Sequence, residues 1–411
     1  MGWKEEYDRK FITAEEAASL VKDGDLVLFT MGRETFAVGL ALAARKEELK
    51  NVQIIAPSPG YDFGWYDDGW GDSFSVTIGH PTAICQDAID ARRADMRPFP
   101  FFTMARPSFF TESPPDFLLV ELSPPDEKGF CSFGASLWNK KQHIKQAKAV
   151  IAEVNDNLIR TCGDNFVHVS EIDHFVEHTG SGKGLKRGTL GGREIKQPEP
   201  YVKKIAENVG SLPKDGDTFQ VGIGRITEHL VRMGMLSNKQ DLVFHSEATP
   251  PGIITAVKEG AITGKYKNVF PNKVIVTSLG GGTAEEMEWA SENPLFWLVD
   301  VDFLEDVGTL AAIDNLVSVN QALAVDLRGQ VAAETLGTRI LSQAGGQIPF
   351  HIGALLSKGG RAITVLPSTA QGGKVSRIVP TLLEGTVVTI PYVCTNCVVT
   401  EYGIARLWGK S

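Results

Sequence analysis

Lys22-Asp-Gly-Asp-Leu-Val-Leu-Phe-Thr-Met-Gly-Arg33 is the stretch that decides the fold, because a related stretch returns as Lys214-Asp-Gly-Asp-Thr-Phe-Gln-Val-Gly-Ile-Gly-Arg225. Six of the twelve aligned positions are identical, at a constant offset of 192 residues. A shared Asp-Gly pair alone would be uninformative, since turns use it widely. A turn, a short apolar run and a glycine turn that recur together indicate that the 411-residue chain consists of two related halves.

Strands that alternate with helices surround the first copy of this repeat. Thr13 precedes a helix-forming run, Leu26–Phe29 and Val52–Ala56 are apolar strand candidates, and 36–49 between them has a helical pattern. Such alternation is typical of parallel sheets. We therefore predict an α/β fold with two related open α/β domains whose sheets are mainly parallel.

The boundary between the two domains is expected near residues 200–212. Gln197-Pro-Glu-Pro200 has the composition of an inter-domain segment. We assign 1–205 to an N-terminal domain and 206–411 to a C-terminal domain, and we expect the active site at the domain interface.

The composition narrows the class of protein. A hydrophobic content of 43% and a charged content of 22% are those of a globular protein. No apolar run approaches the ~18 residues of a membrane span, so no membrane association is expected. The net charge of -9 argues against nucleic-acid binding. Five scattered cysteines favour a reducing cytoplasm, and we expect no metal site.

Glu247 is the candidate catalytic residue. It follows the apolar run 242–244 and precedes Pro250-Pro-Gly252, which places a carboxylate on a turn at the end of a buried strand. Ligands bind at that edge of open α/β sheets. A glutamate there can be a nucleophile, a general base or a metal ligand, or it can be a plain solvated or helix-capping carboxylate.

Glycine pairs in the second half are candidate binding loops. They occur at Gly222-Ile-Gly224, Gly280-Gly-Gly282, Gly345-Gly346 and Gly359-Gly360. Their backbone N–H groups can face an anion or a developing oxyanion, although each pair alone is equally typical of a plain tight turn. A subset of the nearby basic residues is expected to hold phosphates of a nucleotide-like ligand. These are Lys258, Lys265, Lys267, Lys273, Lys358, Arg361, Lys374 and Arg377.

An aromatic segment lies in the first half. Tyr61, Phe63, Trp65, Tyr66 and Trp70 fall within ten residues. They form either a loop packed onto the core or one wall of an acyl pocket, since such pockets are lined by aromatic side chains.

Taken together, these blocks resemble the family I CoA-transferases of the acetyl-CoA hydrolase/transferase type, which include 4-hydroxybutyrate and butyryl-CoA:acetate CoA-transferases. The resemblance runs nearly end to end. Its blocks include Ser123-Pro-Pro-Asp-Glu-Lys-Gly129, His168-Val-Ser-Glu-Ile-Asp173, Gln220-Val-Gly-Ile-Gly224, Asp241-Leu-Val-Phe-His-Ser-Glu247, Asn320-Gln-Ala-Leu-Ala-Val-Asp326 and Val399-Thr-Glu-Tyr-Gly403.

The resemblance implies a CoA-transferase-like fold and a set of roles. Glu247 would be the nucleophile, with Asn320 and Glu401 bordering the catalytic site. No permanent cofactor is implied: coenzyme A or acyl-CoA and a small carboxylate would be substrates, in a cytoplasmic homo-oligomer, a dimer. The residues expected to bind CoA are Gly222, Ile223, Gly224, Arg225, Ile226, Gly345, Gly346 and Lys358.

The predicted reaction moves CoA from an acyl-CoA thioester to a free carboxylate by a ping-pong mechanism, through a glutamyl-CoA thioester on Glu247. An acyl-CoA hydrolase would use the same intermediates with water as acceptor. The sequence is also compatible with a non-catalytic acyl-CoA-binding protein and with a sugar-phosphate isomerase on a related fold.

Overall fold

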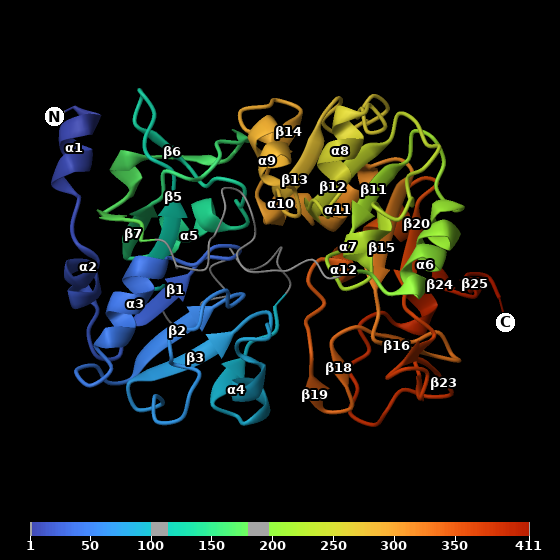
Figure 1. The fold of residues 1–411 in the computed structure, drawn as a ribbon, viewed down its shortest axis with the longest axis horizontal. Coiled ribbons are helices and arrows are strands. Elements are labelled where there is room, and N and C mark those ends of the chain that lie inside the picture. The colour runs from blue at the N-terminus through green and yellow to red at the C-terminus, as the bar shows by residue number, and fades with distance from the viewer. Residues whose placement is uncertain (1, 100–113, 180–196, 411) are drawn as a thin grey trace. The chain divides into compact units, whose positions relative to one another are not determined.

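The structure of the protein is a computed structural model that describes residues 2–99, 114–179 and 197–410 (Figure 1). The described residues form two compact units, the first of 2–99 and 114–179 and the second of 197–410. The expected boundary at residue 205 falls inside helix α6 (Pro200–Gly210), all of which belongs to the second unit. None of the helices in these ranges combines the length and the apolar character needed to cross a membrane.

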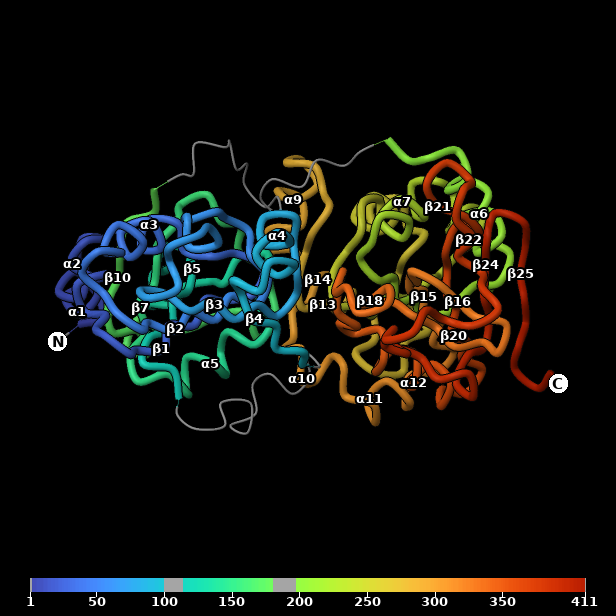
Figure 2. The backbone as a smooth tube through the Cα atoms, turned by 90° about the horizontal axis from the view of Figure 1, so that it is seen from below, coloured from blue at the N-terminus to red at the C-terminus, as the bar shows by residue number. Residues whose placement is uncertain are grey.

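The first unit is built on a parallel sheet of seven strands. Helices lie on both faces, with α2 (Ala14–Leu20) and α3 (Phe36–Ala44) on one and α5 (Lys140–Gln146) on the other (Figure 2). In spatial order the strands are β10 (His174–Glu177), β7 (Ala149–Val154), β5 (Phe117–Leu122), β1 (Leu26–Phe29), β2 (Val52–Ala56), β3 (Phe74–Ile78) and β4 (Ala94–Met96).

The second unit contains a sheet of the same kind, in which the edge pair β24–β25 is antiparallel and the pairs from β24 through to β14 are parallel. Figure 2 shows α11 (Val307–Ala312) and α12 (Gln347–Leu356) on one face of this sheet and α6 and α7 (Thr227–Leu230) on the other. In spatial order its strands are β25 (Gly403–Arg406), β24 (Cys397–Thr400), β20 (Arg361–Val365), β15 (Leu316–Gln321), β11 (Thr218–Val221), β12 (Val243–Ala248), β13 (Val274–Ser278) and β14 (Phe296–Leu298).

The remaining described elements are short. The helices are α1 (Trp3–Arg9), α2 (Ala14–Leu20), α3 (Phe36–Ala44), α4 (Gln86–Asp90), α5 (Lys140–Gln146), α7 (Thr227–Leu230), α8 (Ile253–Lys258), α9 (Ala284–Ala290), α10 (Val301–Leu304), α11 (Val307–Ala312) and α12 (Gln347–Leu356). Strands outside the two large sheets include β6 (Phe130–Ser132), β9 (Phe166–His168), β16 (Ala324–Asp326), β17 (Val331–Ala332), β18 (Thr335–Leu336), β19 (Arg339–Ile340), β21 (Thr369–Ala370), β22 (Val375–Ser376) and β23 (Ile378–Val379).

The sequence repeat is a structural repeat. Strand β1 lies between β5 and β2, and β11 lies between β15 and β12, so the two strands occupy equivalent places in their sheets. Both turns use glycine at a φ of +79°, at Gly24 and Gly216. The N–H of Lys22 donates to Asp25 at 2.7 Å, and the N–H of Lys214 donates to Asp217 at 2.6 Å. The predicted fold of two related α/β halves with mainly parallel sheets is confirmed.

The repeat ends differently in its two copies. In the first unit, the partly buried guanidinium of Arg33 forms a two-pronged ion pair with the buried carboxylate of Glu121 on β5, with Nη2 to Oε1 at 3.2 Å. Such a pair neutralises both charges and holds the turn after β1 against its neighbouring strand. The equivalent arginine of the second unit is Arg225, which is exposed.

Helix α3 is shorter than the pattern 36–49 predicts. The carboxylate of Glu153 accepts hydrogen bonds from the N–H groups of the first residues, Phe36 to Val38, which stabilises the start of the helix. After Ala44 the chain continues in tighter turns, with the N–H of Glu48 bonded to the carbonyl of Arg45. The guanidinium of Arg45 meanwhile binds the carbonyls at the end of α2, which ties the two helices together.

The aromatic segment packs onto the core of the first unit. Phe63, Trp65 and Tyr66 are buried. The Trp65 ring lies 4.7 Å from Phe63, 5.7 Å from Phe29 on β1 and 5.9 Å from Phe74 on β3, measured between centroids. These contacts favour a loop that belongs to the core over a wall of an acyl pocket.

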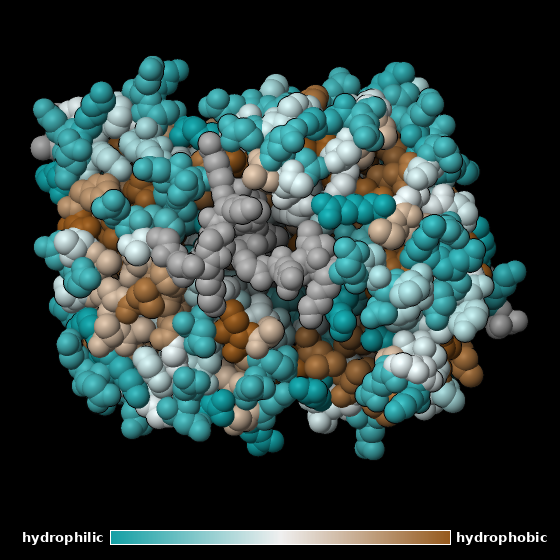
Figure 3. Space-filling model, viewed as in Figure 1, coloured by the Kyte–Doolittle hydropathy of each residue, from teal (hydrophilic) through white to brown (hydrophobic). Residues whose placement is uncertain are grey.

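Polar side chains predominate on the visible surface of each unit, with apolar patches among them (Figure 3).

Trp65→Ala is therefore expected to lower the free energy of unfolding by about 3–5 kcal/mol, because it removes a buried aromatic ring and leaves a cavity. Urea unfolding followed by circular dichroism measures the change. Trp408→Ala is the matched control, since that ring is 55% exposed and should cost little. An unchanged stability of Trp65→Ala, together with an altered preference among acyl chains, would return the segment to the acyl pocket.

Candidate active site

Glu247 is the penultimate residue of β12 and is partly buried. The strand is longer than the sequence suggests, because its pairing with β13 continues from His245 through Ala248. Glu247 therefore projects from the strand itself and not from the following turn. It lies at the edge where the parallel strands of the second sheet end, which is where open α/β sheets bind ligands.

The first turn of α12 contacts the Glu247 carboxylate. Gly346 precedes the helix, and its N–H donates to Glu247 Oε1 at 3.1 Å. A helix N-terminus carries partial positive charge and stabilises a carboxylate. A Cβ at Gly346 would lie 2.5 Å from Glu247 Cδ, so this close approach requires glycine. The structure thus brings together two of the predicted site residues, Glu247 and Gly346.

A second carboxyl group completes this contact. The side chain of Glu305, in the junction between α10 and α11, is fully buried, and its carboxyl group approaches Gly346 as closely as that of Glu247 does. Burial raises the pKa of Glu247 above its ordinary value, while the neighbouring Glu305 and the Gly346 N–H oppose that rise. Sequence reasoning missed Glu305, because nothing in the acidic run Asp300-Val-Asp-Phe-Leu-Glu-Asp306 distinguishes it from its less buried neighbours.

The loop after β11 presents backbone donors at the same edge of the sheet. The N–H of Gly222 is used by the carbonyl of Val319 at 2.9 Å. The N–H groups of the next residues, Ile223, Gly224 and Arg225, have no partner within the described part of the chain. The predicted glycine loop is therefore present, and its available donors begin one residue after Gly222.

Asn320 supports this loop. It lies in β15, is 5% exposed and exchanges hydrogen bonds at 3.0 Å with the amide of Gln220 on β11. A Cβ at Gly222 would lie 2.3 Å from Asn320 Oδ1, so the position of Asn320 requires glycine at 222. The neighbouring Gln321 accepts the N–H of Ile226 at 2.8 Å. Sequence reasoning missed the two glutamines, which look like ordinary strand residues.

Two predicted site residues lie farther from Glu247. Glu401 follows β24 and accepts hydrogen bonds from the N–H and hydroxyl of Ser368. Strand β24 is the fourth neighbour from β12, which corresponds to roughly 19 Å at the usual strand spacing. Lys358 is exposed at the opposite end of α12 from Gly346, where β20 begins, and Gly359-Gly360 lies there too. The glycine pairs are therefore divided between two edges of the sheet.

Basic side chains near the site differ in their exposure and in how far burial lowers their pKa. Arg225 is exposed and lies within electrostatic range of Arg377, whose pKa is lowered, chiefly by burial. Lys267, one of the predicted phosphate ligands, is instead buried, and its Nζ donates to the carbonyl of Phe244 at 3.3 Å. Burial holds the pKa of Lys267 well below its ordinary value. Arg225 and Arg377 are thus better placed than Lys267 to attract an anion.

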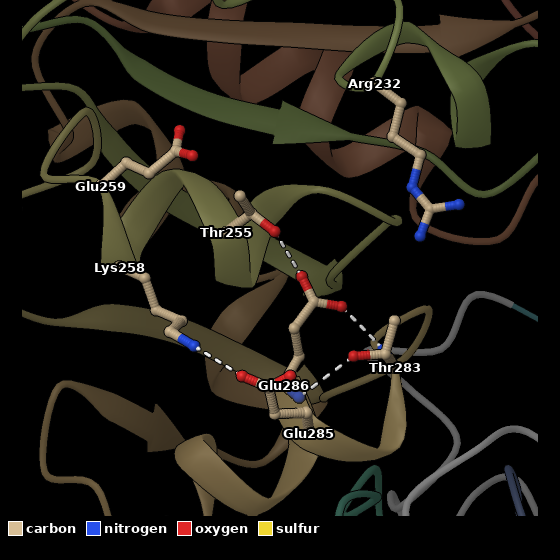
Figure 4. Close-up of a pocket in the computed structure, with 7 residues that line it drawn as sticks. All are labelled: Arg232, Thr255, Lys258, Glu259, Thr283, Glu285 and Glu286. Carbon is tan, nitrogen blue, oxygen red and sulfur yellow. Dashed lines mark hydrogen bonds and ion pairs between the residues drawn. The ribbon is translucent and has the colours of Figure 1, made fainter.

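A pocket of about 420 Å³ lies between α8 and α9 (Figure 4). Lys258 Nζ is 3.4 Å from Glu285 Oε1 across its floor, and Glu286 accepts the hydroxyl of Thr255 and the N–H of Thr283. Glu247 and Gly346 do not line this pocket. The pocket therefore takes no direct part in the chemistry at Glu247. Its lining residues are Arg232, Thr255, Lys258, Glu259, Thr283, Glu285 and Glu286.

Comparisons with known proteins identify the chain. Residues 1–181 match the acetyl-CoA hydrolase/transferase N-terminal domain, and 282–411 match the acetyl-CoA hydrolase/transferase C-terminal domain. The 4-hydroxybutyrate coenzyme A transferase of Clostridium kluyveri is 39% identical over 100% of this chain and 94% of that protein. The chain belongs to the acetyl-CoA hydrolase/transferase family.

A second relative and a solved structure extend the comparison. The butyryl-CoA:acetate CoA-transferase of Anaerostipes caccae is 31% identical over 100% of this chain and 92% of its own length. The crystal structure of RipA from Yersinia pestis matches with a TM-score of 0.89 and 27% identity, over 100% of this chain and 93% of that one. The protein is accordingly an enzyme, a CoA-transferase of this family, and its fold is the family's.

Gly346→Ala is expected to lower kcat for CoA transfer by at least about 100-fold, because the added methyl group displaces the Glu247 carboxylate from its backbone donor. Steady-state kinetics with acyl-CoA and a carboxylate acceptor measures the loss. Gly71→Ala is the matched control, since a Cβ there would meet nothing within 4 Å. Equal activity of the two variants would contradict the close contact at Gly346.

Proposed function

We propose that Glu247 is the nucleophile of the CoA-transferase and carries CoA as a thioester during turnover. The observation that supports this role is the contact of its carboxylate with the N–H of Gly346 at the start of α12. A carboxylate at a strand end, next to N–H donors, has both an attacking oxygen and a means of stabilising an oxyanion.

The first half-reaction forms and uses a mixed anhydride. A carboxylate oxygen of Glu247 attacks the carbonyl carbon of acyl-CoA, and the C–S bond breaks to release the CoA thiolate. The thiolate then attacks the Glu247 carbonyl carbon of the anhydride. This forms the glutamyl-CoA thioester and releases the first acid as its carboxylate. Each step replaces one acyl bond by another, so the covalent route avoids direct attack of a free carboxylate on acyl-CoA.

The second half-reaction reverses these steps with another acid. Its carboxylate attacks the glutamyl-CoA carbonyl and expels the thiolate, which then attacks the new acyl carbonyl and frees Glu247. Every step passes through an oxyanion. The N–H groups of Gly346 and of residues 223–225 are the proposed donors, and one such donor is typically worth about 3 kcal/mol.

Small carboxylic acids are the proposed substrates. The named relatives act on 4-hydroxybutyrate and on butyryl-CoA with acetate, as their names state. We propose that this enzyme takes acyl groups of comparable size, and that Arg225 and Arg377 attract the phosphates of CoA. We also propose that the enzyme is a cytoplasmic homodimer. Light scattering would measure its oligomeric state.

Mass spectrometry of the enzyme incubated with acyl-CoA and no acceptor tests the covalent role. A CoA adduct is expected on the peptide that contains Glu247, and borohydride should reduce it. Glu247→Gln keeps the shape of the side chain but removes the charged nucleophile, so transfer should fall by several orders of magnitude while CoA binding persists. An adduct on another residue, or a fully active Glu247→Gln enzyme, would refute the assignment.

The acyl-CoA hydrolase is the second candidate, because the family includes both activities. Its mechanism differs only in that water, and not a second carboxylate, attacks the glutamyl-CoA thioester. Initial rates over a range of both substrates should show the parallel lines of ping-pong kinetics for a transferase. An adduct that decays as fast in water alone as with added carboxylate would favour the hydrolase instead.

A further inference from the structure

Glu305 occupies a backbone position that is held from both sides. Its N–H donates to the carbonyl of Val301 at 2.9 Å, at the end of α10. Asp300 caps α10 through the N–H of Asp302 at 3.0 Å, and Asp306 caps α11 through the N–H of Thr309 at 2.7 Å. The capping carboxylates on either side therefore point to helix ends, whereas Glu305 turns its carboxyl group inward, where it is fully buried.

The carboxyl groups of Glu305 and Glu247 meet at Gly346. A Cβ built there would lie 2.6 Å from Glu305 Oε1 and 2.5 Å from Glu247 Cδ, so the two groups are no farther apart than the sum of those distances. Two ionised carboxylates repel strongly in a buried site, whereas one proton between them turns the repulsion into a hydrogen bond. A hydrogen bond between these two side chains would require such a proton, because two ionised carboxylates have no donor between them.

The surrounding groups supply little compensating positive charge. His245 on β12 bonds through Nε2 to the carbonyl of Leu304, and burial, followed by the charge of Lys267, lowers its pKa well below the ordinary value. Burial does the same to Lys267. On α12, His351 contacts the carbonyl of Cys394, and burial lowers its pKa too. Strand β13 carries no titratable side chain. The two histidines are therefore mostly uncharged at neutral pH, and burial disfavours the charged form of Lys267 as well.

We propose that Glu305 is a positioning residue that retains one proton during turnover and donates it as a hydrogen bond to Glu247. This inference rests on the proposed function of Glu247. The bond leaves Glu247 ionised and fixes one of its oxygens, so that the other is oriented for attack. The proton stays on Glu305 throughout, since neither the anhydride nor the thioester step consumes or releases a proton. After acylation, the same O–H group faces a carbonyl oxygen of Glu247.

The pH dependence of kcat distinguishes this role from a purely structural one. In the wild-type enzyme, kcat should fall at alkaline pH when the pair loses its last proton, because a second negative charge then displaces the Glu247 carboxylate. Glu305→Gln offers an amide donor of the same shape that does not titrate. We expect its kcat near neutral pH to stay within about tenfold of wild type, and its alkaline fall to disappear.

Glu305→Ala provides the contrast, because it removes the donor and leaves a cavity. We expect its kcat to be lower by about 100-fold or more over the whole pH range. Thermal unfolding and incubation at each pH exclude loss of folded enzyme. If the alanine variant does not fold, the glutamine variant alone decides the question.

Several results would overturn the inference. They are a wild-type kcat with no alkaline fall, a Glu305→Gln enzyme that keeps the fall, and a Glu305→Gln enzyme far slower than tenfold below wild type at neutral pH. The CoA adduct separates this failure from failure of the proposed function. An adduct on Glu247 with an unchanged pH profile in Glu305→Gln refutes only the role of Glu305, whereas a wild-type enzyme without the adduct refutes the role of Glu247.

Discussion

The hydrogen bond from the Gly346 N–H to Glu247 is the interaction on which the candidate site depends. Parallel strands bring the ends of β11, β12 and β15 to one edge, but they do not by themselves hold a carboxylate there. Helix α12 supplies the donor, and its first turn approaches so closely that no side chain fits at Gly346. The sheet therefore provides the position of the nucleophile, and the helix provides its electrostatic environment.

The rest of the site can be understood from the partial burial of this contact. A carboxylate removed from water must either accept hydrogen bonds or become protonated. One donor is the backbone of Gly346, and the proposed second donor is the carboxyl group of Glu305, which is itself fully buried. On the neighbouring strands, the amides of Gln220 and Asn320 satisfy each other. These amides support the loop after β11, whose N–H groups at residues 223–225 stay available. A fixed pair of side chains therefore lies next to unused backbone donors.

Much of the fold could be predicted from the sequence because its signals are local. Leu26–Phe29 and Val52–Ala56 are strands with the predicted bounds, since each is a short apolar run next to turn residues. Helix α3 ends at Ala44 because tertiary contacts of Arg45 replace further helical turns, and no local pattern encodes those contacts. The aromatic segment could be assigned to core or pocket only by its neighbours, Phe29 and Phe74.

The site was less predictable because its members meet only in three dimensions. Glu247 and the Gly345-Gly346 turn stand out in the sequence, by strand-end position and by glycine content. Glu305 does not, since burial alone distinguishes it from Asp302 and Asp306. Lys358 and Gly359-Gly360 look equivalent to the other basic and glycine-rich segments, yet they lie where β20 begins and not where the strands end. Sequence composition cannot tell the two edges of a sheet apart.

The repeated turn carries one consequence for how a duplicated domain acquires a new role. The strand registers make Glu121 of the first unit the counterpart of Gln321 in the second, since Val27 pairs with Phe117 and Phe219 pairs with Val317. The acid neutralises Arg33, whereas the amide binds the N–H of Ile226 and leaves Arg225 exposed. The two copies of the turn thus differ in one nearly isosteric exchange, of a carboxylate oxygen in Glu121 for an amide nitrogen in Gln321. The arginine of the first copy holds two strands together through an ion pair, whereas the arginine of the second copy is exposed to solvent and can contact a ligand.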